Sequence, residues 1–161
     1  MGLDMYLSVR ENVSNWNFDV ETKGNNDRFT NIVEASGITV KESYPVIKIT
    51  NTEIYWRKAN QIHGWFVEHC GGGEDNGQYM PVSRDDLVEL KDTCTVLLDS
   101  RSRALAHDML PPTPGFFFGA YEIDDGYWMD LEHTHKELSD LLDRVTDDNK
   151  WDFEIEYYAS W

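Results

Sequence analysis

The chain is short of the residues that cross-link, export or anchor a protein. Cys70 and Cys94 are its only cysteines, and two thiols outside a CxxC pattern are too few for a disulfide-rich secreted scaffold. No apolar run approaches the roughly 18 residues that a membrane-spanning helix needs. Asp4 stands where a signal peptide carries Lys or Arg, and Tyr6 stands where the myristoylation pattern carries Ser or Thr. These absences predict a cytoplasmic protein with reduced, buried thiols and no membrane contact.

Positive charge is also scarce. The chain has 14 Lys and Arg against 30 Asp and Glu, a formal net charge of −16 at pH 7. Nucleic-acid binding depends on the neutralisation of phosphates by Lys and Arg, so the charge argues against a protein that coats DNA. The imbalance is concentrated in residues 71–161, which hold 21 acids and seven bases, a net charge of −14. Such a surface attracts basic partners.

Motifs that identify a catalytic or metal centre are missing. There is no GxSxG or HExxH pattern, and the run Gly71–Gly73 is followed by Glu74 and Asp75 rather than by the Lys of a phosphate loop. His133 and His135 are two residues apart in an expected helix, which places their rings on different faces. We therefore expect no metal and no cofactor, and we assign no catalytic residue.

The chain does have enough apolar mass for a core. Hydrophobic residues make up 40% of its 161 residues, which predicts one globular domain over residues 1–161 that buries roughly two-thirds of its unfolded surface. Alternation of apolar and polar residues predicts strands over 3–10 and 151–161, the second with one buried face. Residues 11–26 are polar and predict a loop excursion.

Helical spacing appears in four places. Apolar residues at three- and four-residue steps predict helices over 27–36 and 55–70. Ser83 and Asp86 form a capping box at the start of a further helix, and Asp124 or Asp125 caps the last long one. Further strands are expected over 38–42, 46–50 and 116–121, the first two as a hairpin. The predicted fold class is α+β, a mainly antiparallel sheet with three to four helices packed on it.

The helix expected over 55–70 begins with a dense set of functional side chains. An Arg can pair with phosphate or carboxylate, while aromatic rings stack on a flat base, so this set predicts a pocket for a nucleotide-like anion. The candidate ligand-binding residues are Tyr55, Trp56, Arg57, Lys58, Asn60, His63, Phe117 and Trp161. The alternative interpretation is that the aromatic rings are core, the cations are solvated, and His63 is a buried histidine satisfied by the protein itself.

The acidic half suggests a second kind of site. Four candidate protein-interaction residues near the end of the last long helix are Asp140, Asp143, Asp147 and Asp148. They fit an acidic decoy that mimics nucleic acid and inhibits a basic host protein, and the more common interpretation of such acidity is a surface selected for solubility.

Several motifs resemble a family of small uncharacterised proteins encoded by tailed bacteriophages. They are the start Met-Gly-Leu-Asp-Met-Tyr-Leu, the block Tyr-Trp-Arg-Lys-Ala-Asn-Gln-Ile-His-Gly-Trp-Phe-Val at residues 55–67, Gly-Phe-Phe-Phe-Gly at 115–119, and the terminal Tyr-Tyr-Ala-Ser-Trp. The resemblance implies a phage accessory protein acting in the cytoplasm of the infected host bacterium, and it carries over no catalytic residues.

Three functional hypotheses follow. The first is stoichiometric binding of a nucleotide-like small molecule during infection, as an anti-defence device. The second is the acidic decoy, whose partner is a basic host protein. The third is a small hydrolase-like enzyme with His63 as general base and Arg57 as an electrostatic clamp. The sequence favours binding over catalysis, and none of the three involves direct contact with nucleic acid or a membrane.

Overall fold

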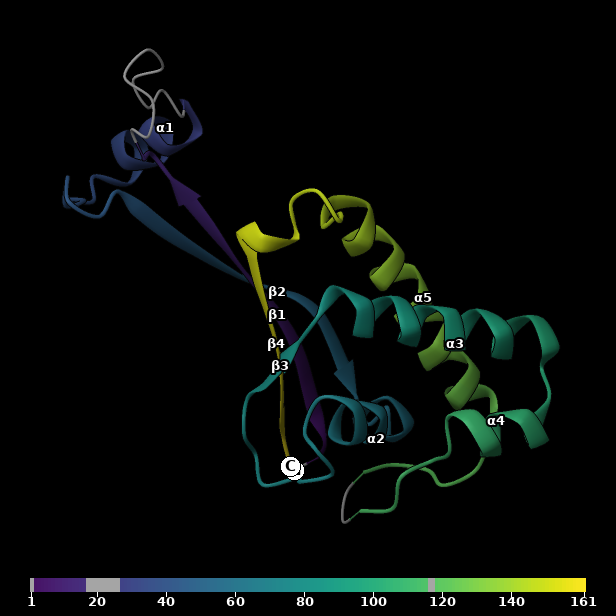
Figure 1. Ribbon diagram of the computed structural model, residues 1–161. Coiled ribbons are helices and arrows are strands. Elements are labelled where there is room, and N and C mark those ends of the chain that lie inside the picture. The colour runs from purple at the N-terminus through teal and green to yellow at the C-terminus, as the bar shows by residue number, and fades with distance from the viewer. Residues whose placement is uncertain (1, 17–26, 116–117) are drawn as a thin grey trace.

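A four-stranded antiparallel sheet forms the frame of the protein. The computed structural model describes residues 2–16, 27–115 and 118–161. The strands are β1 (Asp4–Ser14), β2 (Val46–Arg57), β3 (Met80–Val82) and β4 (Phe153–Ser160), and their order in the sheet is β2-β1-β4-β3. Together with the helices described below, this sheet confirms the predicted α+β class (Figure 1).

Strand β1 lies at the centre of the sheet and confirms the alternating pattern at the start of the chain. It pairs with β2 on one side and with β4 on the other, so that Met5 lies opposite both Trp56 and Ala159. Met5, Leu7 and Val9 are buried beneath the helices. The strand runs on to Ser14, so the predicted loop at residues 11–26 is wrong for its first four residues, and residues 17–26 lie outside the described part.

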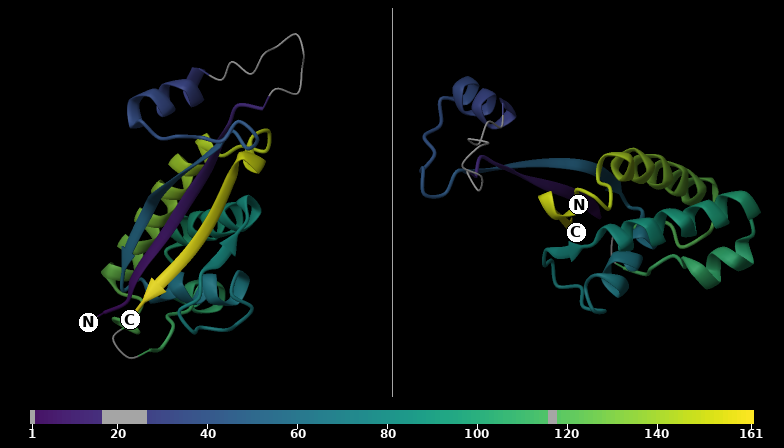
Figure 2. Two further views of the ribbon diagram at one scale, coloured as in Figure 1. Left: turned by 90° about the vertical axis from the view of Figure 1, so that its left-hand side faces the viewer. Right: turned by 45° about the horizontal axis from the view of Figure 1, so that its top comes forward.

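Helices cover one side of the sheet. In chain order the helices are α1 (Asp27–Ser36), α2 (Asn60–His69), α3 (Arg84–Ser100), α4 (Arg103–Met109), α5 (Asp125–Arg144) and the 3-10 turn η1 (Lys150–Asp152). The described residues thus hold five α-helices rather than three to four. Helices α2 to α5 gather on one side, while α1 lies at the far end of β1 and β2 (Figures 1 and 2). No helix of the described residues is long and apolar enough to cross a membrane.

The expected helix caps are present. The Ser83 hydroxyl accepts a hydrogen bond from the backbone N–H of Asp86, whose carboxylate accepts one from the N–H of Ser83, which is a complete capping box. Asp124 caps α5 by accepting from the N–H of Tyr127. Local side-chain chemistry therefore defines the starts of both long helices.

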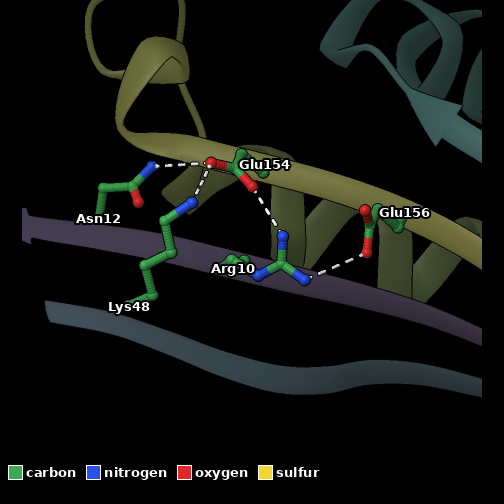
Figure 3. A network of polar contacts seen from close by, with 5 residues as sticks. All are labelled: Arg10, Asn12, Lys48, Glu154 and Glu156. Carbon is green, nitrogen blue, oxygen red and sulfur yellow. Dashed lines mark hydrogen bonds and ion pairs between the residues drawn. The ribbon is translucent and has the colours of Figure 1, made fainter.

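Polar cross-strand contacts occupy the face of the sheet that these helices leave open. Arg10 of β1 contacts Glu154 at 2.7 Å and Glu156 at 3.4 Å, and Lys48 of β2 reaches Glu154 at 2.9 Å (Figure 3). The hydrogen bonds from Lys48 and Arg10 lower the pKa of Glu154 to about 2. Arg10 and Lys48 are therefore neutralised within the sheet.

The remainder of the open face carries a row of tyrosines. Tyr6 lies directly opposite Tyr55 and Tyr158 in the strand register, with ring centroids 5.3 and 6.5 Å away, and Tyr79 stacks on Tyr158 at 4.7 Å. These rings contact one another across neighbouring strands, which stabilises the sheet.

Several sequence-based boundaries are wrong. The helix expected over 55–70 begins only at Asn60, because Tyr55, Trp56 and Arg57 pair with β1 as the end of β2. Residues 38–42 and 118–121 form no strand, and residues 116–117 lie outside the described part. Helix α4 and strand β3 were not predicted.

The buried face of the last strand is shorter than its alternation suggests. Ile155, Tyr157 and Ala159 are buried, whereas Trp151 is 85% exposed and Trp161 is 43% exposed. Trp151 lies in the 3-10 turn, before the strand pairing begins, so the sheet cannot bury it.

The two cysteines are free. Cys94 is buried and Cys70 is half-buried, and burial raises the pKa of each thiol to about 12. Both stay protonated at neutral pH, which makes them unreactive core residues.

Candidate functional site

The aromatic residues at the end of β2 serve the core and the sheet. Trp56 is 2% exposed, and its indole Nε1 donates a hydrogen bond to Thr134 Oγ1 at 2.8 Å. Tyr55 points to the opposite face, where its hydroxyl donates to Asp4 Oδ1 at 2.5 Å, and this bond raises the pKa of the phenol. For these two predicted ligand-binding residues, the contacts favour the structural interpretation.

Asn60 fixes the segment that follows α4. Its Oδ1 accepts a hydrogen bond from the N–H of Thr113 at 3.0 Å. Its Nδ2 donates to the carbonyl oxygens of Phe118 at 3.2 Å and Ala120 at 2.8 Å. The side chain is 2% exposed, so its amide is used by the protein itself. Asn60 therefore positions a wall and does not face a ligand.

His63 is the centre of a three-residue chain of hydrogen bonds. Its ring is 1% exposed and lies on α2, with Nδ1 2.8 Å from the hydroxyl of Tyr157 and Nε2 3.1 Å from Oδ2 of Asp75. Tyr157 comes from β4 and is fully buried, and Asp75 comes from the turn after α2. Residues far apart in sequence thus converge on one imidazole.

One tautomer of the imidazole satisfies all three groups of this chain. Burial raises the pKa of Tyr157 well above its usual value, so the phenol keeps its proton. Its hydroxyl lies within hydrogen-bond distance of Nδ1 of His63, and it donates to that nitrogen in the tautomer with the ring proton on Nε2. Nε2–H then donates to the Asp75 carboxylate. The chain runs from Tyr157 through His63 to Asp75, and it orients that carboxylate.

Asp75 lies on the wall of a cavity of about 360 Å³, which we call the proline cleft. Helix α2 forms one side of it, and the segment from Met109 to Pro114 forms the other. Its remaining lining residues are Gln61, His63, Gly64, Trp65, Val67, Glu68, His69 and Phe118. Proline, Leu, Met and aromatic side chains make most of the wall, as is usual for a small-molecule site.

The charges of the proline cleft are of one sign. Glu68 and Asp75 line it, and none of its described lining residues is Lys or Arg. His69 stacks on Trp65 with centroids 4.3 Å apart and planes 9° apart, and its Nδ1 lies 2.9 Å from the carbonyl oxygen of Trp65. The cleft therefore offers carboxylate acceptors on an apolar background.

Arg57 and Lys58 line a different hollow, which we call the charged cavity. It has a volume of about 230 Å³ and lies between the β2–α2 junction and the start of α5. The other residues that line it are Asn60, Gln61, Gly119, Ala120, Glu122, Asp124, Gly126, Tyr127 and Asp130. In the described part of the chain no ion pair includes Arg57 or Lys58.

Asp130 is the most buried carboxylate of the charged cavity. Its Oδ2 accepts a hydrogen bond from Gln61 Nε2 at 3.1 Å. Burial raises its pKa, and the hydrogen bond from Gln61 acts in the opposite direction. Gln61 is 3% exposed and also lines the proline cleft, so the two cavities meet at this side chain.

The structure thus divides the pocket that the sequence predicts. His63 lines the proline cleft, while Arg57 and Lys58 are among the residues that line the charged cavity. Trp161 packs on His63, with centroids 5.6 Å apart, and on Phe118 at 5.9 Å. Phe117 lies outside the described residues.

Sequence reasoning missed Asp75 and Gln61, which line the cavities, and Tyr157, whose hydroxyl contacts His63. Asp75 was considered only as a reason to exclude a phosphate loop, and Tyr157 only as part of a strand. Gln61 lies within the block at residues 55–67. The signal that could have singled it out is an amide side chain next to the apolar positions of an expected helix.

The four aspartates proposed for protein interaction lie at the end of α5 and just after it. All are exposed. Asp140 pairs with Lys136 at 3.0 Å, and Asp147 pairs with Lys150 at 3.2 Å and Arg84 at 3.5 Å. The negative charge of this surface is therefore partly neutralised by the protein's own cations.

No group of three or more possible metal ligands exists among the described residues. Comparisons with protein-family models, with curated proteins and with solved structures give no significant match. The resemblance to a phage protein family therefore stays a prediction.

Proposed function

We propose that the protein binds a small organic cation with a flat apolar body in the proline cleft. The observation that carries the proposal is the orientation of Asp75 by the buried chain from Tyr157 through His63. A carboxylate held in this way, beside a wall of proline and aromatic side chains, suits an amidinium or ammonium group attached to an apolar body.

The charge of the site supports this ligand class. A cation that enters the cleft meets Glu68 and Asp75, and the net charge of −16 raises the local concentration of cations around the whole protein. An anion would meet two carboxylates without a compensating Lys or Arg in the described lining.

Binding fits this arrangement better than catalysis does. A general base must come within hydrogen-bond distance of a substrate proton. The ring of His63 is 1% exposed, and the group on its Nδ1, the hydroxyl of Tyr157, belongs to a fully buried side chain. His63 is therefore proposed as a residue that positions Asp75. This leaves the hydrolase hypothesis without a general base.

The test uses three probes of one shape and different charge: benzamidine, benzamide and benzoate. Isothermal titration should give benzamidine a Kd at least tenfold lower than that of benzamide, and no measurable heat of binding for benzoate. Equal binding of benzamidine and benzamide, or tighter binding of benzoate, would contradict the proposal.

Variants locate the site of binding. Asp75→Asn should remove the preference for benzamidine, and Glu68→Gln should weaken it by a smaller factor, because Asp75 is the carboxylate that His63 orients. Arg57→Gln is the control, since Arg57 lines the other cavity. If benzamidine affinity falls with Arg57→Gln and not with Asp75→Asn, the cleft is the wrong site.

The other hypotheses keep their own tests. A nucleotide-like anion should raise the melting temperature, and Arg57→Ala should abolish that rise. The acidic decoy should lose a basic partner on charge reversal at Asp140, Asp143, Asp147 and Asp148. A phage counter-defence role remains a prediction from the resemblance alone.

A further inference from the structure

Trp151 is the most exposed of the large hydrophobic side chains in the described part of the chain, at 85%. It lies in η1 and borders a cavity of about 250 Å³, which we call the edge pocket. The lining of the edge pocket includes Val82, Arg84, Val145, Lys150, Phe153 and Ile155, and it shares no residue with the proline cleft. An exposed indole beside an apolar cavity is typical of an interaction site.

The edge pocket exists because β3 is short. Its last residue, Val82, pairs with Ile155 of β4, and the chain then enters α3 at Arg84. Phe153 begins β4 two residues earlier and has no partner in the described pairing of β3 with β4. Val82, Ile155 and Val145 are buried members of the main core that line the pocket. The pocket therefore opens onto apolar core side chains.

The two cations that line the edge pocket are engaged within the protein. Arg84 Nη1 lies 3.5 Å from Oδ1 of Asp147, and Lys150 Nζ lies 3.2 Å from the same oxygen. Arg84 Nε also donates to the carbonyl oxygen of Val145 at 2.9 Å. Lys150 Nζ lies 5.6 Å from the centroid of the Trp151 ring. The positive charge at the pocket is therefore largely neutralised by Asp147.

Exposed carboxylates lie beside the edge pocket. Asp85 lines it, and Asp143, Asp148 and Asp152 each lie within two residues of a lining residue in the chain. All four are exposed, and no ion pair among the described residues includes any of them. The uncompensated charge next to the pocket is therefore negative.

We infer that the edge pocket and Trp151 form a docking surface for a basic protein segment that carries one apolar anchor side chain. The anchor would enter the pocket, and its flanking Lys or Arg residues would lie near the exposed carboxylates. A volume of about 250 Å³ is below the roughly 300–1,000 Å³ of pockets for drug-sized ligands, which favours a single side chain. The net charge of −16 disfavours a second copy of the chain as the occupant. The inference does not depend on the proposed function.

The probes are three acetylated and amidated pentapeptides: Lys-Lys-Leu-Lys-Lys, Lys-Lys-Ser-Lys-Lys and Glu-Glu-Leu-Glu-Glu. Binding is followed by the indole N–H NMR signal of Trp151, which is assigned by its absence in Trp151→Phe. The basic leucine peptide should give a saturable shift with a Kd about tenfold lower than that of the serine peptide, and the acidic peptide should give none. No saturable shift, or equal affinity for the two basic peptides, would overturn the inference.

Substitution of Trp151 tests the position of the docking surface. Isothermal titration of the basic leucine peptide should show a Kd about tenfold higher for Trp151→Ala. Met129→Ala is the matched control, because it removes another highly exposed apolar side chain from the opposite end of α5, and its Kd should not change. A loss of affinity in Asp75→Asn and not in Trp151→Ala would assign the peptide to the proline cleft and refute the inference.

The contribution of charge is tested by a pair of double variants. Asp148→Asn with Asp152→Asn should raise the Kd of the basic leucine peptide about threefold or more. Asp99→Asn with Asp108→Asn removes the same charge from residues that do not line the edge pocket, and it should have a smaller effect. Equal effects would contradict the inference. A dimer in analytical ultracentrifugation that Trp151→Ala dissociates would identify a second copy as the occupant and would also overturn it.

Discussion

The proline cleft and the charged cavity flank the same helix and differ in almost every chemical respect. The cleft has apolar walls and charges of one sign, whereas the charged cavity is polar and has both. Asn60, Gln61 and His63 lie close in sequence, but each residue of a helix turns by about 100°, so they point to different neighbours. Proximity in sequence near a helix start is therefore poor support for a common pocket.

The largest effect is expected at Asn60. Its side chain holds the segment that follows α4, and residues of this segment line both cavities. Asn60→Ala leaves the N–H of Thr113 and the carbonyls of Phe118 and Ala120 without their partner. We expect a loss of about 3 kcal/mol in the free energy of unfolding, measured by urea denaturation, and weaker benzamidine binding in the proline cleft.

Asn12→Ala is the matched control for that experiment. Asn12 makes one long hydrogen bond of 3.4 Å to Glu154 on the open face, so its replacement should cost less than about 1 kcal/mol. Similar losses for the two variants would mean that Asn60 does not hold the wall.

Gly64 allows the proline cleft to be altered alone. A Cβ added there would lie 1.9 Å from Oγ1 of Thr113, so Gly64→Ala should push the proline wall outward. Alanine is otherwise the better helix former, and the net loss in the free energy of unfolding should be about 1–2 kcal/mol. Benzamidine affinity should fall as well, because Gly64 lines the proline cleft.

The double variant Gly64→Ala with Thr113→Ala checks the cause. It removes the clashing hydroxyl and should restore most of the stability, since the nearest remaining atom, Cβ of residue 113, lies 3.1 Å away. If the Gly64→Ala protein is as stable as the wild type, the segment that contains Thr113 moves without cost, and the prediction is wrong.

The smallest effect on stability is expected at Asp130, which lines the charged cavity and not the proline cleft. Burial raises the pKa of this carboxyl in the folded state, so its contribution to stability is full below the unfolded value and is lost as the pH rises through the folded value. Asp130→Asn should therefore match the wild type within about 0.5 kcal/mol at pH 3 and exceed it at pH 7, as measured by urea denaturation. A difference that does not change with pH would contradict this account.

The sequence predicted what short-range chemistry determines. The capping boxes and caps at Ser83 and Asp124 locate α3 and α5, and alternation locates β1 and β4. The prediction from sequence failed at the β2–α2 junction for two reasons. Ala59 precedes the helix without a capping side chain. Trp56 fits the apolar spacing of α2, although in the structure it pairs with Met5 of β1.

The candidate sites depend on contacts over long separations. His63 could be singled out as a functional or buried histidine, but its two partners lie 12 and 94 residues away in the chain. The walls of both cavities come from the segment after α4, which reaches α2 through Asn60 over more than 50 residues. No periodicity encodes such contacts, because they depend on how the elements pack.

Strand β4 enters the sheet between two strands that precede it in the chain, and this has a consequence for biosynthesis. As the polypeptide emerges from the ribosome, β1 and β3 must wait for residues 153–160 before either can pair with its common neighbour. Tyr157 arrives on that strand, so the imidazole of His63 acquires its orienting phenol only when translation has passed residue 157. A nascent chain stalled earlier would have its helices but would lack the contact between Tyr157 and His63.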